Sequence, residues 1–248
     1  MTNGEVFVWE LLGTATLILL GVGVVANVTL RRSLGRGGGW LLISFGWGFA
    51  VFTGASVSAP SGAHLNPAVT LGLAVAGRLD WDRVPVYVAA QLLGAIVGAT
   101  LGWLVYKLQF DTHDDPSGTR GIFCTAPTVP GWPWNLLTEV VATLVLVVWI
   151  LLSPAARAGE QGVPQFGNSA LGYAAVAFVV VAIGASLGGP TGYAINPARD
   201  LGPRIVYALA PIRGKGGAEW GYAWVPVVGP LVGGALAGLL YLALPTPA

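Results

Sequence analysis

The sequence predicts an all-α membrane protein: six transmembrane helices plus two re-entrant half-helices in an inverted repeat. The chain is 54% hydrophobic and 9% charged, whereas soluble domains carry about 25% charged residues. Six apolar stretches approach or exceed the length of about 20 residues that crosses a bilayer core. The tripeptide Asn-Pro-Ala occurs twice, at 66–68 and 196–198, and each copy opens an apolar run too short to cross.

The long stretches predict spans at residues 6–29, 40–59, 84–106, 135–153, 169–188 and 223–244. Residues 67–77 and 197–209 form the two shorter runs, and at 1.5 Å per residue each covers only about half of a core about 30 Å thick. Asn is a favoured N-cap and Pro a favoured first helical residue, so each Asn-Pro-Ala marks a helix start. Two such starts within apolar sequence predict half-helices that meet inside the membrane, which indicates a pore.

The two halves of the chain repeat. Glu10 recurs as Glu139 at an offset of 129 residues, and the Asn-Pro-Ala copies are 130 residues apart. Because each half holds an odd number of spans, the halves must be inverted across the membrane. We therefore expect a single channel domain over residues 1–248, with a first repeat at 1–107, a connecting loop at 108–133 and a second repeat at 134–248.

Composition and motifs exclude several classes of protein. The formal net charge of +1 argues against nucleic acid or another strongly charged partner. The longest polar segment holds His113, Asp114, Asp115 and Cys124, but their spacing matches no metal site, so a solvated loop is expected. The sequence contains no catalytic constellation and no cofactor motif, so neither an enzyme nor a cofactor is expected.

Residues 61–70, SGAHLNPAVT, and 192–200, GYAINPARD, are similar to the two signature loops of the aquaporin family. The resemblance covers nearly the whole chain, and Arg199 followed by Asp200 resembles the glycerol-facilitator, or aquaglyceroporin, branch. It implies a passive channel for glycerol and other small neutral solutes, such as polyols and urea, that also passes water and excludes protons and ions. It further implies a homotetramer in the lipid bilayer of the cell membrane, with both termini in the cytoplasm.

The centre of the expected pore is formed by Asn66 and Asn196. Their side-chain oxygens can cap the half-helices while their NH2 groups donate to a passing hydroxyl. The chain before each half-helix must be extended, and such backbone is tolerated in a membrane only where it lines a cavity. A ladder of carbonyl acceptors is therefore expected from Gly62, Ala63, His64, Gly192, Tyr193 and Ala194.

By resemblance, Arg199, Tyr193 and Gly184 belong to a narrow outer selectivity filter. Because Gly184 has no side chain, the wall opposite Arg199 is expected to be open. The fourth member is an aromatic residue on the second span, for which Trp47 is favoured. Trp47 precedes the first Asn-Pro-Ala by 19 residues, one fewer than is usual in the family, so an ungapped alignment selects Gly46. An interfacial anchor is the alternative role for Trp47.

Three buried acids are expected to support the pore. The resemblance assigns Glu10 and Glu139 to accepting backbone N–H bonds from the two loops, where snorkelling to an interface is the alternative. Asp200 is expected to orient loop groups. A water-selective aquaporin is the nearest rival function. An ion-coupled secondary transporter, also built from inverted repeats, is disfavoured because the spans hold few ionisable residues besides these acids and Arg199.

Counting basic residues disagrees with the implied orientation. With cytoplasmic termini, the cytoplasmic loops hold Arg78, Arg83 and Arg157, and the outer loops hold Arg31, Arg32, Arg36, Lys107, Arg120, Arg213 and Lys215. That reverses the usual excess of positive charge inside. The family orientation is kept, because the inserted half-helices fix the pore in either case. Low Lys with abundant Ala, Gly, Val and Arg indicates a bacterial source.

Overall fold

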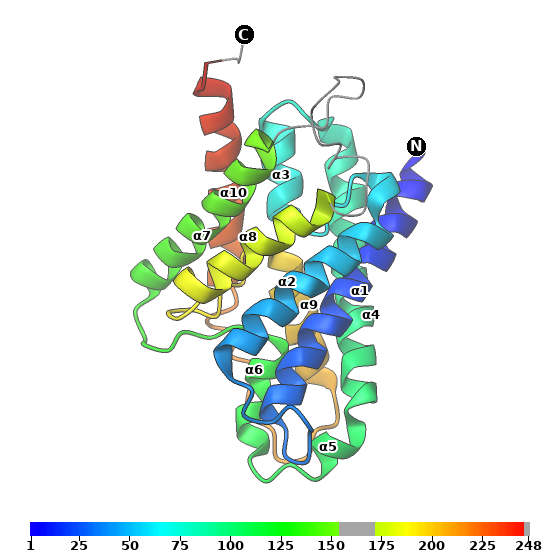
Figure 1. Ribbon diagram of the computed structural model, residues 1–248, viewed down its shortest axis with the longest axis vertical. Coiled ribbons are helices and arrows are strands. Elements are labelled where there is room, and N and C mark those ends of the chain that lie inside the picture. The colour runs from blue at the N-terminus through cyan, green and yellow to red at the C-terminus, as the bar shows by residue number, and fades with distance from the viewer. Residues whose placement is uncertain (154–171, 246–248) are drawn as a thin grey trace.

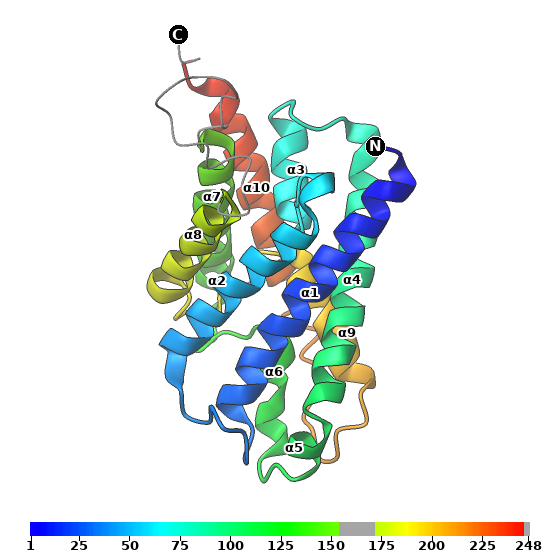
Figure 2. The ribbon, with the colours of Figure 1, turned by 45° about the vertical axis from the view of Figure 1, so that its right-hand side comes forward.

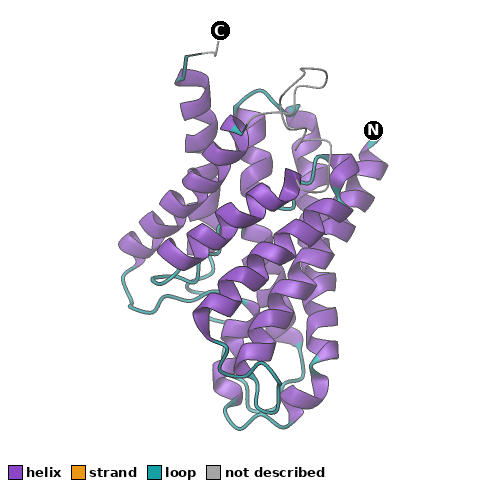
Figure 3. Cartoon of the chain, viewed as in Figure 1, coloured by secondary structure: helices purple, strands orange, loops and turns teal. Residues whose placement is uncertain are grey.

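The computed structural model describes residues 1–153 and 172–245, and every regular element among them is helical (Figure 3). The long helices are α1 (Asn3–Thr29), α2 (Gly39–Val57), α4 (Val84–Val105), α7 (Trp132–Leu152), α8 (Gly172–Leu187) and α10 (Val225–Ala243). Five of them are long and apolar enough to cross a membrane, and α8 is apolar over its 16 described residues. The start of the predicted span at 169–188 and the loop residue Arg157 lie outside the described residues.

Two shorter helices, α3 (Pro67–Val75) and α9 (Pro197–Leu209), begin at the two Asn-Pro-Ala tripeptides. The N-terminus and the C-terminal end of α10 lie at one end of the molecule; α3 lies in that half and α9 lies farther from it (Figure 1). Helix α3 ends before the predicted residue 77, because Gly77 has a φ of 70° and a left-handed residue terminates a helix.

The repeats pack by exchanging their half-helices. In the first repeat α1 packs on α2 and α4, and in the second α7 packs on α8 and α10. The half-helix α3 lies mainly against α10 of the other repeat, and α9 lies mainly against α4 (Figure 2). This exchange, together with the contact of α2 with α8, places the two half-helix N-termini next to each other.

Glycines on α4 and α10 allow this close packing. A Cβ added at Gly94 would lie 2.5 Å from the backbone oxygen of Leu11, and one added at Gly234 would lie 2.3 Å from that of Ala68. Since the obstructing atoms are backbone, no side-chain rotation relieves the overlap. Small residues therefore set the separation between the spans and the elements they hold.

The segment at 108–133, expected as a solvated loop, contains regular structure. It includes most of α5 (Lys107–Asp111), the 3-10 turn η3 (Pro116–Thr119) and α6 (Arg120–Phe123); further 3-10 turns are η1 (Ala59–Ser61) and η2 (Trp81–Arg83). Helix α6 contacts α1 and α9 and buries Ile122 and Phe123 completely. Part of this segment is therefore core rather than loop, because its apolar residues pack against α1 and α9.

Candidate functional site

Each Asn-Pro-Ala tripeptide caps its own half-helix. The Oδ1 of Asn66 accepts from the backbone N–H of Ala68 at 2.9 Å. The Oδ1 of Asn196 accepts from the N–H groups of Ala198 at 3.0 Å and Arg199 at 3.2 Å. Pro occupies the first helical position in both cases. These local bonds fix the positive ends of α3 and α9 at the point where the two helices meet.

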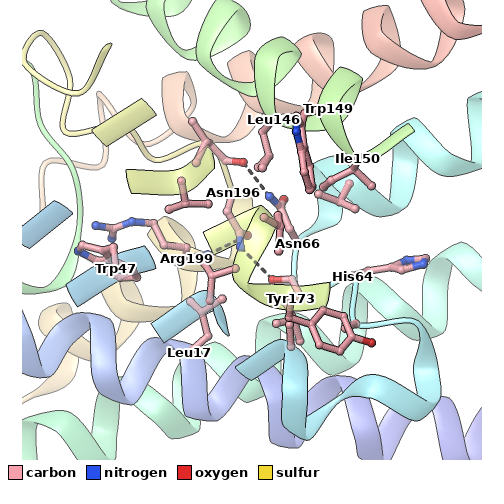
Figure 4. A pocket seen from close by; sticks show the side chains of 18 of the residues that line it. Leu17, Trp47, His64, Asn66, Leu146, Trp149, Ile150, Tyr173, Asn196 and Arg199 are labelled. Atoms are coloured by element: carbon pink, nitrogen blue, oxygen red, sulfur yellow. Dashed lines mark hydrogen bonds between the residues drawn. The ribbon is translucent and has the colours of Figure 1, made fainter. Parts of the chain in front are cut away.

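The same two asparagines also join the loops to each other. The Nδ2 of Asn66 donates to the Ile195 carbonyl and the Nδ2 of Asn196 donates to the Leu65 carbonyl, both at 2.8 Å (Figure 4). Each amide therefore has one of its two N–H groups occupied, where the sequence predicted that the whole NH2 group is free. The second N–H of each remains for a solute oxygen.

The chain before each half-helix has the same unusual backbone in both repeats. Positive φ angles between 38° and 91° occur at Gly62, Ala63, Leu65, Gly192, Tyr193 and Ile195. Four of these residues are not glycine, and such conformations cost about 1–3 kcal/mol each. Among the described residues, no donor bonds the carbonyl oxygens of 62–64 or 192–194. The strain thus leaves a row of carbonyl acceptors unpaired in each loop.

Glu139 lies against the second of these loops. Its Oε1 accepts from the Thr191 hydroxyl at 2.7 Å and from the Ala194 N–H at 3.0 Å, and its Oε2 accepts from the Ile195 N–H at 2.9 Å. The side chain has no solvent exposure. Because the carboxylate accepts hydrogen bonds from the N–H groups on one side of this loop, the carbonyl groups face the other side.

Glu10 occupies the equivalent place in the first repeat with more partners. It accepts from the N–H groups of His64 at 3.0 Å and Leu65 at 2.8 Å, and from the Ser61 hydroxyl at 2.6 Å. Gln91 adds a bond of 2.8 Å that has no counterpart among the described residues of the second repeat, where Pro230 stands at the matching position. Sequence reasoning missed these side-chain donors, although a glutamine inside a span is a visible signal.

A cavity of about 230 Å³ lies along the paired loops. One wall is polar and consists of residues 62–66, residues 193–196 and Arg199. The other walls are largely aliphatic and include Leu17, Val51 and Val180. Of the six predicted ladder residues, all but Gly192 line the cavity. The predicted filter residue Gly184 does not line it, and neither do the supporting acids Glu10, Glu139 and Asp200.

Arg199 and Trp47 stack together at one side of the asparagine pair, and His64 lies at the other (Figure 4). The guanidinium carbon of Arg199 is 3.9 Å from the Trp47 ring centroid, and its Nη1 donates to the Phe123 carbonyl at 3.2 Å. Both side chains line the cavity, whereas Gly46 faces Val24 of α1. The cation is thus held by a ring face and a carbonyl, and no acid among the described residues is bonded to it.

The wall at Gly184 is not open, and the prediction of an open wall is wrong. A Cβ added there would lie 2.8 Å from Cζ and 2.9 Å from the hydroxyl oxygen of Tyr193. The missing side chain makes room for the Tyr193 ring rather than for a solute. We call the space bounded by Arg199, Trp47 and Tyr193 the outer constriction.

Asp200 holds the loops around the outer constriction through a partner that the sequence analysis did not single out, Arg204. Asp200 accepts from both the N–H and the hydroxyl of Thr125 at 2.7 Å, and from the Arg204 Nε at 2.8 Å. Arg204 donates onward to the carbonyls of Thr125 at 2.8 Å and Ala218 at 2.5 Å. An acid and an arginine four residues apart in an apolar half-helix are a signal that the sequence offered.

Two of the polar residues in the connecting segment contact the same partner, Arg31. His113 accepts from the Arg31 N–H at 3.1 Å, Asp114 pairs with the Arg31 side chain, and Cys124 is buried. Burial raises the pKa of the Cys124 thiol to about 12, which makes it a poor metal ligand. Among the described residues no group of three or more His, Cys, Asp or Glu could hold a metal ion.

Comparison with known proteins agrees with this architecture. The profile of the major intrinsic protein family matches residues 2–241. A glycerol uptake facilitator protein of Bacillus subtilis (strain 168) is 50% identical over 233 residues, which cover 94% of this chain and 82% of the relative. A probable glycerol uptake facilitator protein of Thermotoga maritima is 48% identical over 238 residues, covering 96% and 98%. The X-ray structure of the aquaglyceroporin from Plasmodium falciparum matches with a TM-score of 0.80 at 33% identity, covering 97% of this chain and 96% of that one.

Proposed function

The chain belongs to the major intrinsic protein family, and we propose that it is a passive membrane channel for glycerol and other small neutral solutes, and for water. The observation that carries this is the two-sided cavity. Unpaired carbonyls, the two asparagine amides and Arg199 form one wall, and aliphatic side chains form the rest. A polyol has the same division, because its hydroxyls lie along one edge and its CH groups along the other.

Charge exclusion follows from the centre of the cavity. Two half-helix N-termini, each worth about +0.5 elementary charge, converge there. Arg199, only 7% exposed, adds a full positive charge at the outer constriction. Cations and hydronium therefore meet a positive electrostatic potential that repels them. A neutral solute instead replaces its hydrogen bonds to water with hydrogen bonds to protein donors and acceptors.

The rival functions lack comparable support. A proton-coupled transporter uses ionisable side chains along its substrate path as proton relays, but the described cavity lining contains no Asp, Glu or Lys. For a water-selective channel, the aromatic and aliphatic surface beside Arg199 supplies no bond to water, although it suits the carbons of a polyol. Relatives at 48–50% identity are named as glycerol facilitators, and we propose no catalytic reaction.

Assembly and orientation complete the proposal. The spans carry many exposed apolar side chains, such as Leu41 on α2 and Phe178 on α8, which suit contact with lipid and with other copies in a homotetramer. We place both termini in the cytoplasm. Cross-linking in membranes, and protease access to a tag at the C-terminus in intact cells, test these two points.

Stopped-flow light scattering on proteoliposomes tests the function directly. Glycerol and sucrose gradients should give glycerol and water permeabilities well above those of protein-free liposomes. Val51 lines the cavity, whereas Val57 on the same helix is exposed outside it. Val51→Trp should therefore reduce both fluxes and Val57→Trp neither. Water flux without glycerol flux in the parental protein would favour the water-selective alternative.

A further inference from the structure

The Trp47 ring at the outer constriction lies between Arg199 and a glycine of α1. A Cβ added at Gly21 would lie 2.2 Å from Cζ3, 2.3 Å from Cη2 and 2.5 Å from Cε3 of Trp47. Three adjacent ring atoms at nearly equal distance place Gly21 over the face of the ring, not at its edge. Because Arg199 also lies over the ring, 3.9 Å from its centroid, and one face cannot hold both groups, the two residues occupy opposite faces.

The second aromatic wall of the constriction has a similar backing. A Cβ added at Gly188 would lie 2.5 Å from Cδ1 of Tyr193, 2.6 Å from the Gly184 carbonyl oxygen and 2.7 Å from Cζ2 of Trp40. Trp40 meets Tyr193 edge to face, with ring centroids 5.7 Å apart, and its Nε1 donates to the Gly184 carbonyl at 2.8 Å. The Tyr193 ring therefore rests in a recess formed by Gly184, Gly188 and Trp40.

We propose that Gly21 and Gly188 set the solute size limit of the channel by positioning Trp47 and Tyr193 from behind. Neither glycine lines the cavity, so both are positioning residues that act through the rings. A methyl group at Gly21 requires the Trp47 ring to move by about 1.2 Å to restore an ordinary carbon–carbon contact of about 3.4 Å. The opposite face already contacts Arg199, whose guanidinium carbon is 3.9 Å from the ring centroid. The ring and the guanidinium must therefore shift together, and this shift narrows the constriction. This inference rests on the proposed function.

The test compares two alanine variants with matched controls on neighbouring glycines. Gly21→Ala should lower glycerol permeability by about tenfold or more, because displacements of about 1 Å have large effects in fitted sites, while water permeability changes by less than about twofold. Gly23→Ala is the control, since its Cβ would meet only Tyr106 Cε2 at 4.0 Å. Gly188→Ala should likewise lower glycerol permeability more than water permeability. Its control is Gly189→Ala, whose Cβ would meet nothing within 4 Å.

A rescue experiment separates a positioning role from a folding defect. Trp47→Phe in the Gly21→Ala background removes the displaced part of the ring, so glycerol flux should recover. A Gly21→Ala protein that folds by size exclusion and keeps the parental ratio of glycerol to water permeability overturns the inference. The inference is also overturned if the Gly21→Ala protein fails to fold and adding Trp47→Phe does not restore folding. A parental protein that passes no more glycerol than empty liposomes is a different result, which overturns the proposed function itself.

Discussion

Replacing Glu139 with leucine should destabilise the protein far more than removing one of its hydrogen-bond donors. Its carboxylate accepts from the Thr191 hydroxyl and from the N–H groups of Ala194 and Ile195 at 2.7, 3.0 and 2.9 Å. Leucine has a similar size but accepts no hydrogen bond, so three donors become unpaired where no water reaches. At about 1–3 kcal/mol for each unpaired buried group, Glu139→Leu costs about 3–9 kcal/mol. Loss of the buried charge offsets part of this cost.

Two milder variants give the expected order of effects. Thr191→Val removes a single donor and leaves the carboxylate two backbone partners, so it should cost about 1 kcal/mol. Glu139→Gln keeps one acceptor oxygen but turns an NH2 group toward a donor, which should cost about 1–3 kcal/mol. The leucine variant should therefore be the least stable of the three.

Denaturant unfolding in detergent measures this order, with fluorescence from the ten tryptophans as the signal. Glycerol flux of the surviving protein should fall in the same order, because the carbonyls turn toward the cavity only while the N–H groups are held behind. If Glu139→Leu is within about 1 kcal/mol of Thr191→Val, the carboxylate does not hold the loop and the reasoning is refuted.

Three further substitutions probe the half of the molecule that holds α9. Asp200→Ala leaves Arg204 as a buried cation without its acid and should lower the free energy of unfolding by about 3–5 kcal/mol. Adding Arg204→Met should recover most of that loss. A double variant that is no more stable than Asp200→Ala alone would contradict the pairing. Arg199→Val removes the cation of the constriction and should let protons leak, measured as decay of a pH gradient in proteoliposomes; an unchanged gradient would exclude Arg199 as a barrier. Lys215 donates to the last carbonyls of α9, including that of Ala208 at 2.9 Å. Lys215→Met should therefore lower the free energy of unfolding by about 0.3–2 kcal/mol in the same unfolding assay. Arg213 is exposed, so the control variant Arg213→Met should leave the free energy of unfolding unchanged.

Features that depend on local chemistry were predictable from the sequence. Each half-helix starts at Asn-Pro-Ala because the cap bond and the Pro geometry involve only neighbouring residues. The membrane-spanning, all-helical class followed from the length and hydropathy of the apolar stretches, and the related structure confirms it. The assignments of individual pore residues remain predictions, although the structure places Asn66, Asn196, Arg199 and Trp47 around one cavity.

Features that depend on contacts between distant segments were not predictable. The solvated-loop expectation for 108–133 missed α6, whose burial depends on surfaces offered by α1 and α9. The Phe123 carbonyl beside Arg199 gives no sequence signal, since every residue has a carbonyl. Gly184 was expected to open the wall, but the space is filled by Tyr193 from another segment.

The sequence by itself determined where the two half-helices start and which stretches are long and apolar enough to span a membrane. Only the tertiary structure decided how the loops share their polar groups. The amide of Asn66 bonds the loop that holds Asn196, across 129 residues of chain, and the reverse bond spans 131. Such bonds depend on the relative position of α3 and α9, which the packing of glycine-bearing spans sets. Periodicity and capping describe neighbours along the chain, whereas the pore is made by groups that become neighbours only on folding.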